Sequence, residues 1–115
     1  MQSNTGRLYR ITVADRSVSE VSLGGASLTN GDGLLLDGRV LYVVRNQNRE
    51  IVKLQLSEDF GAGAVVGTST DPSFAFPTTI ARAEDRLLVV NAQFDRRGPG
   101  LSPALPFTVS SVPVP

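Results

Sequence analysis

The chain has 115 residues, of which 41% are hydrophobic, a size and composition typical of one domain with a modest core. Its 11 basic and 11 acidic residues cancel and are scattered, so no basic stripe indicates a nucleic-acid partner. The absence of cysteine and histidine excludes disulfides, zinc sites and Ser-His-Asp triads within these residues.

Short runs rich in β-branched residues recur along the chain, and no helical stripe competes with them. In chain order, strands are predicted at residues 8–13, 18–23, 32–36, 40–45, 50–56, 64–68, 78–82, 86–91 and 107–112. Asp37-Gly38 is expected to join the third and fourth strands as a hairpin, because glycine tolerates the positive φ of a tight turn. Glycines and prolines predict a loop over residues 96–103.

Two internal repeats organise these strands. Residues 32–44 align with residues 78–90 at an offset of 46 (78 minus 32). Residues 8–15 align with residues 51–58 at an offset of 43 (51 minus 8), which places apolar residues over apolar ones and charges over like charges. Both offsets fit the period of about 40–50 residues that is typical of β-propeller blades.

The predicted fold class is therefore all-β, a partial β-propeller of about two blades of four-stranded antiparallel sheet. We expect one partial domain over residues 1–115, with the outer strands of one blade in 1–30, a complete blade in 31–76, and the inner strands of the last blade and a C-terminal tail in 77–115. A β-sandwich or small barrel is the alternative, since regular strand spacing occurs there too.

A propeller normally closes its ring with about four to eight blades. The chain is therefore expected to be the C-terminal portion of a longer protein, or a protomer that completes the ring by self-association. The first six residues have neither the charged segment nor the apolar run of a signal peptide. No apolar stretch approaches the ~20 residues of a membrane helix, so we expect a soluble chain without a membrane partner.

The residues 30–44, with Asp32-Gly33 near their start, and the following residues 48–54 resemble the SMP-30/gluconolactonase/LRE-like superfamily. Residues 77–81 and 87–91 look like the final blade of that superfamily. The resemblance implies a six-bladed propeller whose catalytic members hold a divalent cation, often calcium, in the central channel and hydrolyse lactones or related esters. Only its last third would be present.

The resemblance also implies a role for Asp32. The superfamily motif at the start of one innermost strand is Pro-Asp-Gly followed by an apolar residue, and its aspartate is both a metal ligand and the catalytic acid-base. Asp32 occupies that position, with Gly31 in place of the proline. The other family ligands, a glutamate and asparagines from earlier blades, have no counterpart here.

The chemistry of this assignment is coherent but incomplete. A lactone carbonyl needs a Lewis acid for its developing oxyanion and a carboxylate to take the proton of water. The oxygen donors of this chain suit a hard cation such as Ca²⁺ better than zinc, copper or iron. Because Ca²⁺ takes about six to eight oxygen ligands, we expect Asp32 alone to bind it weakly and the isolated chain to be inactive.

Each candidate residue also has a structural explanation. Asp32 at a strand entrance can accept hydrogen bonds from backbone amides and shape the turn. Thr78 and Thr79, one blade on, are candidates for contacting a substrate at the channel mouth, although threonine also favours strands.

Four asparagines, whose amide oxygens are further candidate ligands, are Asn30, Asn46, Asn48 and Asn91. Turn formation is expected for Asn46 and Asn48.

Three functions from different classes follow. The first is part of a calcium-dependent hydrolase of small lactones or esters. The second is a non-catalytic propeller whose loops hold a protein or glycan. The third is a chain that self-associates, because unpaired blade edges are templates for strand pairing.

Overall fold

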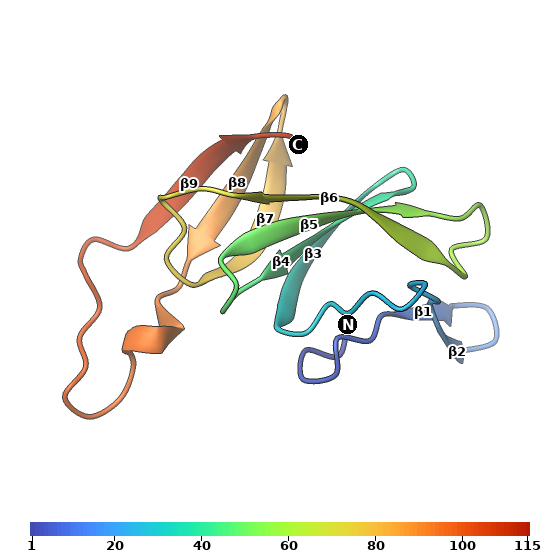
Figure 1. The fold of residues 1–115 in the computed structure, drawn as a ribbon, viewed down its shortest axis with the longest axis horizontal. Helices are drawn as coiled ribbons and strands as arrows, with labels where there is room; N and C mark the ends of the chain where they lie inside the picture. The colour runs from blue at the N-terminus through green and yellow to red at the C-terminus, as the bar shows by residue number, and fades with distance from the viewer.

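The computed structural model describes all of residues 1–115 and consists almost entirely of antiparallel strands (Figure 1). The elements are β1 (Tyr9–Thr12), β2 (Ser17–Glu20), β3 (Gly31–Asp37), β4 (Val40–Arg45), β5 (Glu50–Leu56), β6 (Gly63–Thr70), β7 (Pro77–Ala83), β8 (Arg86–Asn91), the 3-10 turn η1 (Phe94–Arg96) and β9 (Thr108–Pro113). They form three sheets, ordered β1-β2, β3-β4-β5-β6 and β7-β8-β9. The predicted all-β class is confirmed, with antiparallel sheets that do not close on one another as a partial fold requires.

The three sheets follow one another along the arc. The first and last sheets flank the four-stranded middle sheet at opposite ends of the molecule (Figure 1). Between the middle and last sheets, β3 and β4 lie against β7. The innermost strands β3 and β7 therefore run beside each other, as neighbouring blades require.

The offset of 46 that the sequence predicts is present in the strand register. Leu34 pairs with Val43 in the β3–β4 hairpin, and Ile80 pairs with Val89 in the β7–β8 hairpin. Immediately before each pair the register shifts through a β-bulge. The two hairpins are thus structural repeats, irregularities included.

The second strand ends earlier than the sequence predicts, at Glu20 rather than at residue 23. The reason is a change of partner, because Ser22 leaves β1 and bonds to the turn before β6. The N–H of Ser22 donates to the carbonyl of Gly61 at 3.0 Å, and the carbonyl of Ser22 accepts from the N–H of Gly63 at 2.8 Å. This crossing joins the first sheet to the middle one.

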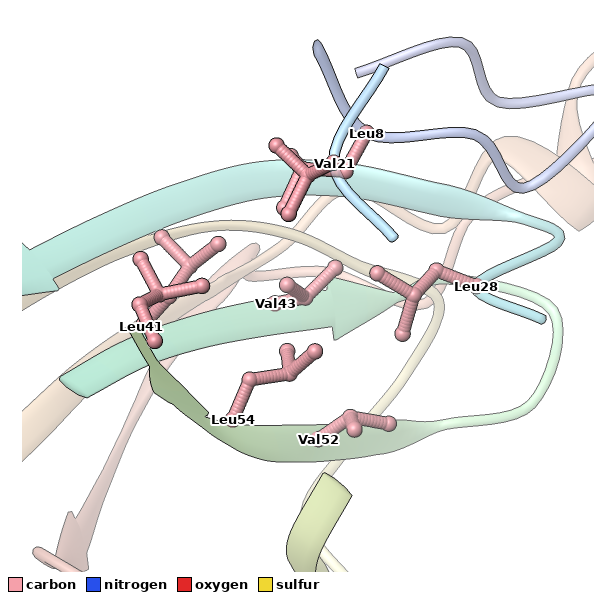
Figure 2. Close-up of a cluster of buried hydrophobic side chains, with 8 residues drawn as sticks. Leu8, Val21, Leu28, Leu41, Val43, Val52 and Leu54 are labelled. Carbon is pink, nitrogen blue, oxygen red and sulfur yellow. The ribbon is translucent and has the colours of Figure 1, made fainter. Parts of the chain in front are cut away.

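Two hydrophobic clusters hold the sheets together, one on each face of the middle sheet. The first lies between β1–β2 and the middle sheet, and Figure 2 shows Leu8 and Val21 on one side of the cluster and Leu41 and Val43 of β4 on the other. The second lies between the middle and last sheets and contains Tyr42, Val44, Ile51, Phe74, Ile80, Leu87, Val89 and Val112. Because successive strand residues point to opposite faces, β4 contributes to both clusters.

The two ends of the arc keep apolar side chains exposed. On the first sheet these are Ile11 and Val18, and on the last sheet they are Leu88, Val90 and Val109. On β8 they alternate with Leu87 and Val89, which face inward, so they lie on the outward face of their sheet. Each end sheet therefore exposes apolar side chains. In the middle sheet, apolar side chains like these on β4 are covered by the neighbouring sheets.

The β5–β6 turn is held by one carboxylate. Asp59 Oδ1 accepts from the Ser57 hydroxyl at 2.7 Å and from the N–H of Gly61 at 2.9 Å. The Ser57 hydroxyl, and then the Gly61 N–H, lower the pKa of Asp59 below its usual value of 3.8.

Acid is expected to weaken this turn. Because the folded-state pKa of Asp59 lies below the unfolded value, its stabilising effect is present above about pH 4 and is lost as the pH falls through the folded pKa. Denaturation midpoints measured from about pH 6 to about pH 2 should fall less steeply for Asp59→Asn than for the unmodified chain. Ser57→Ala, which keeps the carboxylate but removes the hydroxyl that donates to it, should also make the midpoints fall less steeply; equal slopes for all three proteins would contradict the assignment.

Candidate functional site

The sequence candidates lie in the two equivalent bulges of the innermost strands. Asp32-Gly33 forms the bulge of β3, and Thr78-Thr79 forms the bulge of β7. The arithmetic of the repeat relates them directly, since 78 minus 32 and 79 minus 33 both give 46. Bulges re-aim side chains and are over-represented next to active sites.

The backbone that leads into each bulge is also repeated. Asn30 and Phe76, one residue before β3 and β7, both have left-handed conformations, with φ of 66° and 52°. The carbonyl of Asn30 accepts from the N–H of Asn46 at 3.1 Å, and the carbonyl of Phe76 accepts from the N–H of Ala92 at 3.1 Å. Non-glycine residues with positive φ are uncommon, so this shared geometry is strong evidence that the two strand entrances are equivalent.

Gly33 brings the two bulges into contact. A Cβ atom at Gly33 would lie 2.6 Å from the carbonyl oxygen of Thr78 and 2.6 Å from the Cα of Thr79. Only a residue without a side chain allows so close a backbone approach. Asp32, Thr78 and Thr79, which the sequence singled out separately, are therefore placed side by side.

Gly33→Ala is expected to lower the free energy of unfolding by about 1–3 kcal/mol, because the new methyl group would force the two innermost strands apart. Gly67→Ala is the matched control, since a Cβ at that strand position meets no atom within 4 Å. Urea denaturation of both variants measures the difference. Equal effects would show that β3 and β7 do not approach as described.

The Asp32 carboxylate is exposed and has polar neighbours at the start of β3. The amide nitrogen of Asn46 lies 3.4 Å from Asp32 Oδ2, and the amide nitrogen of Asn30 donates to Asn48 Oδ1 at 3.0 Å. Asn46 also begins the β4–β5 turn, in which its carbonyl accepts from the N–H of Arg49 at 3.2 Å. The turn role predicted for Asn46 is confirmed, and its side chain additionally reaches the candidate carboxylate.

These residues do not make up a calcium site by themselves. No group of three or more Asp, Glu, His or Cys side chains in the chain is arranged to hold a metal ion. The side-chain partner of Asp32 is the Asn46 amide, which directs its nitrogen, and not its oxygen, toward the carboxylate. One carboxylate with such neighbours falls well short of the about six to eight oxygen ligands that Ca²⁺ takes.

Asn91 lies apart from this site and has a structural role. Its side chain is 1% exposed, and its Oδ1 accepts from the N–H of Ala75 at 2.9 Å. Its amide nitrogen donates to the carbonyl of Ser73 at 3.1 Å and lies 3.0 Å from the Thr108 hydroxyl and 2.9 Å from the Ser110 hydroxyl. Both the oxygen and the nitrogen of this amide are therefore engaged, within the last sheet and with the loop that leads into it, and the side chain acts as a structural link.

A related bond at the equivalent position of the preceding blade explains why Asn91 is polar. One repeat earlier (91 minus 46), Arg45 donates from Nε to the carbonyl of Thr29 at 2.7 Å. Thr29 is itself the equivalent of Ala75 (75 minus 46), so both blades fasten the end of the second strand to the approach to the first. The repeat could have revealed this pair, because both residues at that position are polar.

The turn carboxylate Asp37 is also accounted for by structure. It begins the β3–β4 turn, in which Gly38 has a φ of 60°, as the sequence predicts. Its side chain forms an ion pair with Arg82 of β7. Since both partners are exposed, the pair is expected to contribute less than about 1 kcal/mol.

Comparison with known proteins adds no family assignment to this geometry. The structure contains no helix with the length and apolar character needed to cross a lipid bilayer. The chain matches no protein-family model and no curated protein sequence.

Proposed function

We propose that the chain is the C-terminal part of a closed propeller of the SMP-30/gluconolactonase/LRE-like kind, in which Asp32 contributes one carboxylate to a hydrolytic site for small lactones or esters. The observation that supports this most is the placement of Asp32 in the β3 bulge against Thr78-Thr79 in the β7 bulge. Both bulges lie on innermost strands, which line the central channel when blades close into a ring.

The roles of the three residues follow from their chemistry. An exposed carboxylate at a channel mouth can accept the proton of an attacking water. The threonine hydroxyls beside it can donate hydrogen bonds to oxygen atoms of the substrate. A calcium ion belongs to this proposal only if other blades supply most of its ligands, because Asp32 alone does not form a site.

The test uses the complete polypeptide that contains these residues in a closed ring. Asp32→Asn is expected to reduce the rate of small-lactone opening by about 100-fold or more, because asparagine cannot accept the proton. Asp37→Asn is the matched control, since it removes a carboxylate from the far end of the same strand, where the side chain pairs with Arg82. Its rate should be unchanged.

Two results would argue against a hydrolase. Retained lactone hydrolysis in a folded Asp32→Asn protein would remove Asp32 from the chemistry. A closed ring with Asp32 intact and no hydrolysis, together with a protein or glycan recovered by its loops, would favour the binding propeller instead.

Self-assembly is a second candidate function, favoured by the exposed apolar faces at both ends of the arc. Ile11 and Val18 are 65% and 61% exposed on the first sheet, and Val109 is 58% exposed on the last. Burying such faces between copies would remove apolar surface from water at about 25 cal/mol per Å². Light scattering of residues 1–115 should then report a defined oligomer, and a stable monomer at high concentration would exclude this candidate.

A further inference from the structure

One edge of β1 is open. The carbonyl of Leu8 accepts from the N–H of Val21 at 2.8 Å, which makes these two residues a hydrogen-bonded pair next to β1 and β2. Because backbone groups of an antiparallel strand alternate between its two edges, Tyr9 and Ile11 direct their N–H and C=O groups away from β2. No named strand lies on that side in the sheet order β1-β2.

A short bridge shows which kind of strand belongs there. Gln2 pairs with Arg7 in antiparallel fashion, and the N–H of Gln2 donates to the carbonyl of Arg7 at 2.8 Å. At the offset of 43 (45 minus 2 and 50 minus 7), this bridge corresponds to the pair Arg45–Glu50. That pair lies next to the turn, where β4 ends and β5 begins. Gln2 thus corresponds to Arg45, the last residue of β4. It stands where a strand equivalent to β4 would end beside β1.

The same comparison fixes the register of the rest of that strand. Met1 corresponds to Val44 (44 minus 1 is 43) and stands at the level of Leu8, as Val44 pairs with Ile51. A residue directly before Met1 would pair with Tyr9. A residue three positions before Met1 would pair with Ile11. The open hydrogen-bonding groups of β1 are the ones this strand would use.

An apolar groove lies beside this open edge. It encloses about 500 Å³, and nine of its ten lining residues are hydrophobic. On the β3 side it is lined by Leu34 and Leu36, which are 41% and 53% exposed. Leu35, on the opposite face of β3, already packs against the cluster that joins the last sheet. One face of the innermost strand is therefore covered by a neighbouring blade, and the other is not.

A polar group in the groove also lacks a partner. Arg10 lines the groove, and its Nη1 donates to the carbonyl of Asp59 at 2.5 Å. Its Nε is buried without any hydrogen-bond partner. Buried polar groups normally have partners, so the groove is incomplete in polar as well as apolar terms.

We propose that this groove is the docking site of a two-stranded antiparallel β-hairpin, the inner half of the first blade, in a polypeptide segment that runs directly into Met1. The outer strand of the hairpin pairs with β1 in the register of β4 on β5, and its apolar side chains cover Leu34 and Leu36. This inference rests on the propeller part of the proposed function and is independent of lactone chemistry, because its readout is strand pairing.

The test joins to Met1 a second copy of residues 30–43, which are the residues equivalent to the proposed hairpin at the offset of 43. In the extended chain, the backbone amides of Tyr9 and Ile11 should exchange with solvent at least about tenfold more slowly than in residues 1–115. The amides of β5, which are paired in both proteins, report whether each protein is folded.

A register control makes the test specific. One serine inserted between the copied hairpin and Met1 shifts the strand by one residue and turns its apolar side chains to the opposite face. This control should leave the amides of Tyr9 and Ile11 unprotected. If either extended chain fails to fold, the copied segment is added in excess as a synthetic peptide to residues 1–115, and the same two amides are measured.

Three results would overturn the proposal. Fast exchange at Tyr9 and Ile11 in a folded extended chain, or in the presence of excess peptide, would show that no hairpin docks there. Equal protection by the serine-shifted control would show that the register is wrong. Protection of both amides in a dimer of the unextended chain would identify a second copy as the occupant.

Discussion

Leu87→Ala is expected to lower the free energy of unfolding by about 3–4 kcal/mol, the range for deleting a fully buried leucine side chain that leaves a cavity. Leu87 is 0% exposed on the central strand of the last sheet. It belongs to the cluster that contains Tyr42 and Val44 of the middle sheet. The cavity would therefore open between two sheets, where backbone pairing on both sides limits collapse.

Leu88→Ala is the matched control for this substitution. Leu88 is the next residue of β8, is 36% exposed and points to the outward face. Its truncation should cost less than about 1 kcal/mol, because little apolar surface is returned to water. Chemical denaturation of both variants gives the comparison, and similar losses would mean that the last sheet does not pack on the middle sheet through the face that carries Leu87.

Asn91→Leu is expected to cost about 1–3 kcal/mol, although leucine is the more apolar residue at a buried position. The change leaves the N–H of Ala75 without its acceptor at 2.9 Å, whereas the Ser73 carbonyl loses the amide donor at 3.1 Å but keeps the Ser110 hydroxyl at 3.3 Å. Each buried polar group left without a partner costs about 1–3 kcal/mol.

Asn48→Ala serves as the comparison for Asn91→Leu, because Asn48 is exposed and accepts a single side-chain hydrogen bond from Asn30. Its loss should remain within about 0.5 kcal/mol. Thermal or urea unfolding measures both variants. A neutral Asn91→Leu variant would show that the hydrogen bonds around Asn91 do not stabilise the last sheet, and would return Asn91 to the candidates for ligand binding.

The strands were largely predictable because their signals are local. The run 40–45 and the run 50–56 occur in the structure with those bounds, since alternating β-branched residues and the Asp37-Gly38 turn determine them without distant partners. The end of β2 was not predictable in this way. Ser22, which was expected to continue β2, instead pairs with the turn before β6, and this depends on how the first sheet packs on the middle one.

The candidate site was predictable in position but not in detail. The repeat related Asp32 to Thr78, and the structure shows that both lie in bulges in contact through Gly33. The bulges themselves have no simple sequence signal, because they depend on pairing with the neighbouring strand. Asn91 was considered as a ligand because its type suits one, whereas its burial and its hydrogen-bond partners are tertiary features.

The contact between β3 and β7 in solution decides whether the neighbouring sheets are arranged as described. Nuclear Overhauser effects between the α-protons of Gly33 and the protons of Thr79 should be observed in residues 1–115, because the backbones meet at these two residues. If those effects are absent while cross-strand effects within the β3–β4 and β7–β8 hairpins are present, the hairpins form but do not stand side by side as neighbouring blades. That result would contradict the packing of the middle sheet against the last sheet. It would also contradict the contact between the bulge of Asp32 and the bulge of Thr78 and Thr79.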